Sequence, residues 1–146
     1  MKITKIAIAS DHAGFELKEK LKKWLQEKGF IIKDLGTNSR KITDYPDYAH
    51  PLALAIEKKE SDIGISLCGS GNGINMTANK HQGIRSALCW NKEIAKLARQ
   101  HNDSNICALP ARFVKTREAK KIVEVFLSSE FEGGRHKRRI EKIPIK

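Results

Sequence analysis

Short apolar runs alternate with longer amphipathic stretches along the whole chain, and this alternation limits the possible folds more than any other feature. Runs typical of β-strands cover residues 5–9, 30–32, 63–67, 84–90 and 105–109. Between them, apolar residues recur at helical spacing, as in Phe15 to Leu25 before Gly29. Strict alternation predicts an α/β fold. We expect a Rossmann-like, three-layer α/β/α sandwich around a parallel sheet of five strands.

The chain is expected to form a single domain. Its 146 residues are enough for one core and too few for two ordinary domains, with a basic C-terminal segment from about residue 133. Further helices are predicted from Pro46, from the Gly73 turn to about Lys80, from an Asn91 cap to Arg99 and from a Thr116 cap. No apolar run approaches the roughly 20 residues of a membrane span.

The charge balance is strongly basic, with 28 Lys and Arg against 17 Asp and Glu and a formal charge of +11. Such a charge suits either a nucleic acid or a small anionic substrate. Binding of single-stranded nucleic acid usually needs aromatic side chains for stacking, and residues 135–146 contain none. A small anion is therefore favoured, and neither a nucleic acid nor a membrane is expected as a partner.

The cysteine pattern points to a reduced, cytoplasmic protein. The three cysteines, at 68, 89 and 107, form no CxxC pair and leave an odd count. The apolar start of the chain is cut short by Asp11-His12, which argues against a signal peptide. No carboxylate and histidine cluster stands at metal spacing, so neither a metal nor another cofactor is expected.

Ligands of parallel α/β sheets bind at the carboxyl ends of the strands. The loops that follow the predicted strands contain Asp11-His12, the segment Cys68 to Gly73, and Ala111-Arg112. These loops hold the polar and reactive residues of the chain, so we expect the site there.

The segment Cys68-Gly69-Ser70-Gly71-Asn72-Gly73 is the strongest local signal. Its glycines allow backbone N–H groups to converge on an oxyanion, and a thiol at a helix N-terminus is favoured as thiolate, which suits a base. The spacing matches neither GxGxxG nor a P-loop. A small buried cysteine before a tight turn is the structural alternative.

Each other candidate also has a structural interpretation. Asp11 either caps a helix or accepts hydrogen bonds from substrate hydroxyls, while His12 meets an anion. His101 and Asn102 either end a helix or supply an acid/base group. Tyr45 either packs or donates its hydroxyl to a ligand.

Two arginines in the basic tail form a further candidate. Arg135 and Arg139 share a face if Gly134 starts a helix, and they would form a phosphate clamp with Arg112 as a third member. The alternative is a solvated tail. Together, a thiol base, an oxyanion cradle and a phosphate clamp fit isomerisation of a phosphorylated sugar, which needs no redox cofactor.

These residues resemble the ribose-5-phosphate isomerase B family, which also includes allose- and galactose-6-phosphate isomerases. The resemblance covers nearly the whole chain and runs through the following segments, in family order: Ser10–Phe15, Thr43–Pro46, Cys68–Gly73, Ala78–Lys80, Gly83–Arg85, Arg99–Asp103 and Glu132–His136. It implies a homodimer with active sites built from both subunits and interconversion of ribose 5-phosphate and ribulose 5-phosphate in the pentose phosphate pathway. It leaves open whether dimers pair into tetramers.

The resemblance also implies residue roles. Cys68 matches the proton-abstracting base and His101 the acid/base that opens the sugar ring. The residues matched to substrate binding are Asp11, Tyr45 and Asn102 at the hydroxyls, the amides of Gly69, Gly71, Asn72 and Gly73 at the enediolate, and His12, Arg112, Arg135 and Arg139 at the phosphate.

Two positions depart from the family pattern. Ser70 stands where many members have threonine and keeps the hydroxyl that assists ring opening, and Asn72 occupies a variable position. These departures leave a hexose 6-phosphate, from allose or galactose, as an alternative substrate. The alternative from another class is a non-catalytic sugar-phosphate or nucleic-acid binding protein.

Overall fold

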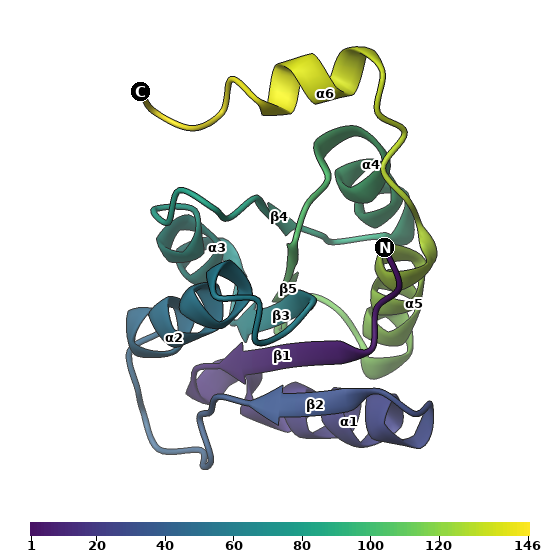
Figure 1. The fold of residues 1–146 in the computed structure, drawn as a ribbon. Coiled ribbons are helices and arrows are strands. Elements are labelled where there is room, and N and C mark those ends of the chain that lie inside the picture. Colours follow the sequence, from purple (N-terminus) through teal and green to yellow (C-terminus); the bar gives the residue numbers. More distant parts are fainter.

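The computed structural model describes residues 1–146 as a five-stranded, all-parallel sheet with helices on both faces (Figure 1). The strands are β1 (Lys5–Ser10), β2 (Ile31–Asp34), β3 (Ile63–Cys68), β4 (Ser86–Leu88) and β5 (Ile106–Pro110). The helices are α1 (Phe15–Glu27), α2 (Pro46–Glu57), α3 (Asn72–Ala78), α4 (Lys92–Asn102), α5 (Thr116–Ser128) and α6 (Arg135–Ile140), with a 3-10 turn at His12–Gly14. The predicted sandwich is confirmed.

Two apolar layers fill the space between sheet and helices. Side chains alternate along β3, so Ile63, Ile65 and Leu67 pack with α1, α4 and α5, while the opposite face meets α2 and α3. Gly64 lies against Leu52, which brings α2 close to the sheet. Burial on both faces explains why the strands read as continuous apolar runs.

Some predicted boundaries are corrected. The fourth strand is shorter than the expected 84–90, because β4 is an edge strand that pairs only with β5 over Ser86–Leu88. Thr116 is the first residue of α5 and not its cap; the cap position is Lys115, which makes no capping hydrogen bond. Asn91 does cap α4, accepting a hydrogen bond from the Ile94 N–H at 2.9 Å.

The strand order β2-β1-β3-β5-β4 creates a switch point between β1 and β3. The chain moves from β1 outward to β2, then returns past β1 to β3, so the following loops diverge at the carboxyl edge and leave a crevice for ligands. Asp11 and Cys68 lie at this point. None of the helices has the length and hydropathy that crossing a bilayer requires.

Helix α6 (yellow in Figure 1) lies beside α4 and not on the sheet. The Glu132 N–H donates to the Gln100 carbonyl at 3.0 Å, which ties the segment before α6 to the end of α4. The basic C-terminal segment is therefore placed with α4.

Candidate active site

Cys68 and Asp11 lie next to each other at the carboxyl edge of the sheet. In the register of β1 with β3, Ser10 pairs with Leu67, so Asp11 stands opposite Cys68 on the adjacent strand. The Asp11 N–H donates to the Leu67 carbonyl at 3.3 Å. On the other side, the Cys68 carbonyl accepts from the Ala111 N–H at 2.9 Å, which places the start of the Arg112 loop beside the Cys68 backbone.

Cys68 ends β3 with 5% of its surface exposed and packs among Ala49, Ile74 and Ala108. Helix α3 begins only at Asn72, so the expectation of a thiol at the helix N-terminus is wrong. Between them, Gly71 takes the left-handed φ of 78°, which lets the loop turn back over the sheet edge. The thiol is therefore held by packing, with the loop above it.

Two of the loop glycines make room for side chains from other elements. A Cβ at Gly69 would lie 3.1 Å from a guanidinium nitrogen of Arg112, and a Cβ at Gly73 would collide with the ring of Tyr45. The side chains of Arg112 and Tyr45 thus lie on the backbone of the Cys68 loop. This contact brings together residues that the sequence could only assign to the same edge.

Asp11 caps a helical turn, as its structural alternative predicts, and one of its carboxylate oxygens stays free of the cap. Its Oδ1 accepts from the N–H groups of Ala13 and Gly14 at 3.0 and 3.2 Å, which caps the turn after β1. The other carboxylate oxygen takes no hydrogen bond from these amides, so capping leaves an acceptor at the site.

His12 is oriented by a reciprocal pair of hydrogen bonds with Thr43. The His12 N–H donates to Thr43 Oγ1, and the Thr43 N–H donates to His12 Nδ1, both at 3.1 Å. Because Nδ1 accepts, the ring proton of neutral His12 is on Nε2, which can donate to an anion. Sequence reasoning missed Thr43 as an orienting residue, because nothing in its spacing along the chain links it to His12.

Ser70 and Asn72 are exposed at the top of the loop. The Asn72 N–H donates to Ser70 Oγ at 3.2 Å, so the Ser70 hydroxyl still has its own proton to offer. The loop therefore presents a hydroxyl in addition to backbone amides.

The other predicted site residues lie at the end of the sheet opposite to Cys68. His101 and Asn102 end α4, three residues before β5, so they lie near the amino end of that strand. Since Gly64 pairs with Ile106 and Cys68 with Pro110, the two ends are separated by four strand residues, or about 13 Å. One chain therefore does not bring His101 to Cys68.

The predicted phosphate clamp is divided in the same way. Arg135 and Arg139 are exposed on α6, one helical turn apart as expected. Because α6 lies beside α4, Arg135 and Arg139 lie at the same end of the sheet as His101, whereas the Arg112 side chain lies against Gly69. The expectation that Arg112 joins them is not met within one chain.

His101 lies in a cluster with Glu132 and His136 that sequence reasoning missed. Glu132 Oε1 is 3.6 Å from Nε2 of each histidine, and the two imidazoles stack with centroids 4.2 Å apart and planes tilted by 11°. Burial lowers the pKa of His136 from its usual 6.5, and the nearby His101 and Arg135 add to this effect. The four-residue spacing of Glu132 and His136 is the signal that could have suggested the cluster.

Cys89 and Cys107 are core residues, as expected, and both are fully buried. A hydrogen bond with Cys89, together with burial, raises the pKa of the Cys107 thiol well above its usual value. Both thiols are therefore closed off from solvent within the core, whereas Cys68 lies at the sheet edge with 5% of its surface exposed.

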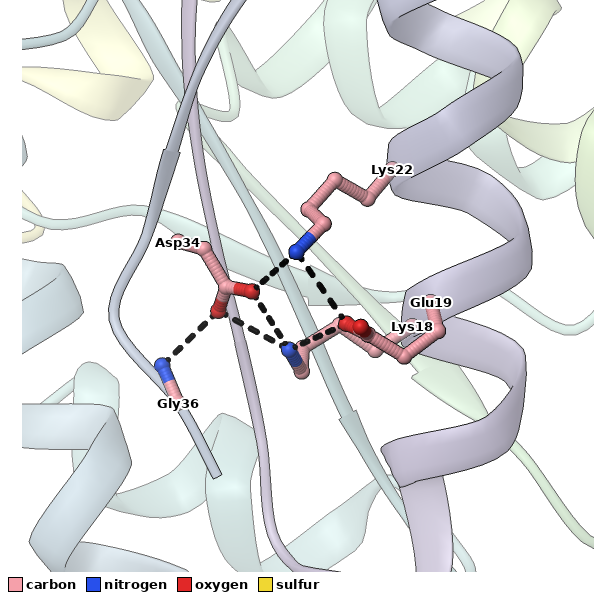
Figure 2. A network of polar contacts seen from close by, with 5 residues as sticks. All are labelled: Lys18, Glu19, Lys22, Asp34 and Gly36. Carbon is pink, nitrogen blue, oxygen red and sulfur yellow. Dashed lines mark hydrogen bonds and ion pairs between the residues drawn. The ribbon is translucent and has the colours of Figure 1, made fainter. Parts of the chain in front are cut away.

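A buried ion-pair network supports the loop beside Asp11 (Figure 2). The Lys18 ammonium, with no exposed surface, donates to both oxygens of Asp34 at 2.8 Å, and Asp34 also accepts from Lys22. Asp34 Oδ1 accepts from the Gly36 N–H, and the Gly36 carbonyl accepts from the Ser10 N–H at 2.6 Å. The network thus fixes the strand end that leads into Asp11.

The chain is similar to known isomerases over nearly its full length. The family described as Ribose/Galactose Isomerase matches residues 6–143. A ribose-5-phosphate isomerase B from Escherichia coli (strain K12) is 47% identical over 139 residues, which are 95% of this chain and 93% of that protein.

Solved structures agree with this result. A ribose 5-phosphate isomerase from Thermotoga maritima superposes with a TM-score of 0.95 at 52% identity, covering 97% of both chains. Ribose-5-phosphate isomerase B from Mycoplasma genitalium, solved with bound ribulose 5-phosphate, superposes with a TM-score of 0.92 at 46% identity, covering 96% of this chain and 93% of that one.

Proposed function

The chain belongs to the ribose/galactose isomerase family of aldose–ketose isomerases, and on this basis we propose that it interconverts D-ribose 5-phosphate and D-ribulose 5-phosphate through an enediolate. The observation that carries the proposal is the position of Cys68 at the β1/β3 switch point, between Asp11 and the Arg112 loop. A base, a hydroxyl acceptor and a phosphate-binding cation meet there, as the reaction requires.

The thiolate of Cys68 is the base. It removes the C2 proton of the open-chain aldose as the C1 carbonyl oxygen becomes the enediolate oxygen O1. The C2 hydroxyl then passes its proton to O1 as the C2 carbonyl forms, and the Cys68 thiol returns a proton to C1. The small apolar residues around Cys68 pack against its side chain and hold the sulfur in place. Amides of the Gly69 to Gly73 loop stabilise the negative charge on the enediolate oxygens.

Substrate groups are assigned to the side chains around this loop. Asp11 accepts hydrogen bonds from sugar hydroxyls through its free carboxylate oxygen. His12, whose Nδ1 is occupied by Thr43, donates from Nε2 to the phosphate, and Arg112 neutralises it. The Tyr45 ring, seated on Gly73, closes one side of the site and directs its hydroxyl at the sugar.

Two copies of the chain complete each site. His101, Asn102, Arg135 and Arg139 lie at the end of the sheet remote from Cys68, so in one chain they cannot contact the same sugar phosphate. In a homodimer, this end of the second copy covers the Cys68 edge of the first, which gives each dimer two composite sites. The second copy supplies Arg135 and Arg139 to the phosphate.

Ring opening is assigned to His101 of the second copy. Its imidazole accepts the proton of the anomeric hydroxyl as the C1–O4 bond breaks and the C1 carbonyl forms. The Ser70 hydroxyl gives its proton to O4, which becomes the C4 hydroxyl, and takes a proton from the imidazolium in return. Asn102 binds the sugar hydroxyls beside it.

Turnover of two substrates by the purified protein tests this function. We expect turnover of ribose 5-phosphate at a kcat/KM at least tenfold above that of allose 6-phosphate. The Cys68→Ala variant should bind ribulose 5-phosphate and show no turnover. A preference for allose 6-phosphate would assign a hexose phosphate, and absence of turnover on either sugar with retained binding would indicate a non-catalytic binding protein.

A further inference from the structure

Glu132 and His136 converge on His101 from a different part of the chain. His101 ends α4, whereas Glu132 precedes α6 and His136 lies in its first turn. One backbone contact ties this segment to α4, since the Glu132 N–H donates to the Gln100 carbonyl at 3.0 Å. Within the segment, the His136 N–H donates to the Gly133 carbonyl at 3.1 Å, which forms the turn into α6. The three side chains therefore meet because the chain is anchored there.

The two histidines of the stack have different surroundings. The His136 side chain is 7% exposed and its Nε2 has no hydrogen-bond partner, whereas the His101 side chain is 37% exposed. His136 is thus the fixed ring of the stack, and His101 is the one that a ligand can reach. The face of the His101 ring rests on His136 with only 11° between the planes.

The carboxylate of Glu132 approaches the same ring nitrogen, Nε2, of both histidines. Its Oε1 is 3.6 Å from His101 Nε2. A carboxylate at this position favours the tautomer with its proton on Nε2, which leaves Nδ1 as the ring nitrogen that can accept a proton. It also stabilises the imidazolium that forms when Nδ1 has accepted one.

The same three groups are ligand types for zinc, but their geometry does not suit an ion. An imidazole binds a metal along the lone pair in its ring plane, and two nearly parallel, stacked rings direct these lone pairs side by side instead of toward one point. The arrangement instead matches a carboxylate that orients a catalytic imidazole.

We propose that Glu132 and His136 are positioning residues for His101, Glu132 by fixing its tautomer and stabilising its imidazolium, and His136 by supporting its ring face. This inference rests on the proposed function, because it takes His101 as the group that opens the sugar ring. The two residues touch His101 and not the substrate.

Two substrates separate ring opening from the proton transfer at C1 and C2. Ribose 5-phosphate is mainly a closed ring and needs His101, whereas ribulose 5-phosphate cannot close a five-membered ring because its O5 is esterified. Exchange of the C1 proton of ribulose 5-phosphate with deuterium from solvent therefore reports on Cys68 alone. Both measurements use the same purified protein.

The Glu132→Gln variant should lower kcat for ribose 5-phosphate about 10²-fold, since it removes the charge and keeps the shape. It should leave KM and the deuterium exchange of ribulose 5-phosphate within about twofold of wild type.

The His136→Ala variant should lower kcat for ribose 5-phosphate by a similar factor. The His136→Phe variant should keep most of the wild-type kcat, because a ring again supports His101. The exposed Glu124→Gln substitution on α5 is the matched control and should change nothing.

Nitrogen NMR of the histidines gives a readout independent of turnover. Wild-type His101 should be the Nε2–H tautomer, and Glu132→Gln should shift it toward a mixture. An unchanged tautomer together with unchanged kcat in Glu132→Gln would overturn the proposal. Equal losses of ribose turnover and ribulose exchange would also overturn it, since they indicate a general structural defect. If the wild-type protein turns over neither sugar, the proposed function fails instead.

Discussion

The ring of Tyr45 lies directly against Gly73, so closely that no Cβ fits between them. Gly73 belongs to the first turn of α3, and Tyr45 is the residue before α2. The contact joins the start of α3 to the loop before α2. It holds an exposed aromatic side chain over the thiol loop without a hydrogen bond.

A methyl group at Gly73 is expected to displace the Tyr45 ring. Because Tyr45 is exposed, the ring can swing outward, so Gly73→Ala should lower kcat/KM by about 10²-fold with little change in thermal stability. Steady-state kinetics in the Tyr45→Ala background provide the control. If the clash with Tyr45 is the cause, adding Gly73→Ala to the Tyr45→Ala variant should lower kcat/KM little further. A further decrease of about 10²-fold in that background would show that Gly73 acts on the loop itself.

Alkylation should distinguish Cys68 from the other two cysteines. Cys68 is at the site edge, whereas Cys89 and Cys107 are fully buried and the pKa of Cys107 is raised. Iodoacetamide should therefore inactivate the enzyme with one equivalent incorporated at Cys68, and ribulose 5-phosphate should slow the reaction at least tenfold. Peptide mapping by mass spectrometry gives the site, and labelling of Cys89 before activity is lost would contradict the assignment.

Composite sites can be tested by mixing two inactive chains. Co-expressed Cys68→Ala and His101→Ala chains with different tags form heterodimers in which one site has both mutations and the other has neither. Purified heterodimers should recover about half of wild-type activity, although each homodimer is inactive. No recovery would mean that Cys68 and His101 of the same chain serve one site.

Much of the fold could be predicted from the sequence because strands buried on both faces, such as β3, are continuous apolar runs. The edge strand β4 was overestimated, since the apolar character of Ile84 and Cys89 comes from burial outside the ladder. At the site, the carboxyl-edge rule correctly grouped Asp11, Cys68 and Arg112.

The placement of the predicted site residues at two opposite ends of the sheet was harder to predict from the sequence. Spacing along the chain does not show that Glu132 returns to His101, because that contact depends on how the segment after α5 packs on α4. The same rule could have separated His101 from Cys68. A helix that precedes a parallel strand ends at the amino edge, and α4 precedes β5.

Loss of Arg139 should weaken phosphate binding and leave the chemistry intact. A charged hydrogen bond contributes about 1.5–3 kcal/mol, so Arg139→Gln should raise KM for ribose 5-phosphate about ten- to a hundredfold while kcat changes little. Arg138→Gln is the matched control, because Arg138 is exposed on the same helix and has no assigned role. Equal effects of the two substitutions on KM would indicate general electrostatic attraction instead of a specific contact.

The Lys18–Asp34 pair should contribute to stability in a pH-dependent way (Figure 2). Burial by itself would raise the pKa of Asp34, but hydrogen bonds from Lys18, Lys22 and Gly36 outweigh it and lower that pKa below the usual 3.8. A carboxyl with a lowered pKa stabilises the fold above its unfolded pKa, and this stability is lost as pH falls through the folded value. The wild-type protein should therefore lose this contribution only under acidic conditions.

Asp34→Asn should remove the contribution at neutral pH, because it leaves the buried Lys18 with Glu19 as its one charged partner. A hydrogen bond to a charged group contributes about 1.5–3 kcal/mol, which urea unfolding at pH 7 can measure, and the difference from wild type should shrink toward pH 3. Glu60→Gln is the control, since the exposed Glu60 pairs with Lys33 on the surface and should leave the unfolding midpoint unchanged. A difference between Asp34→Asn and wild type that does not change with pH would show that the substitution acts through packing, because the loss of the Asp34 charge matters only where that carboxyl is ionised.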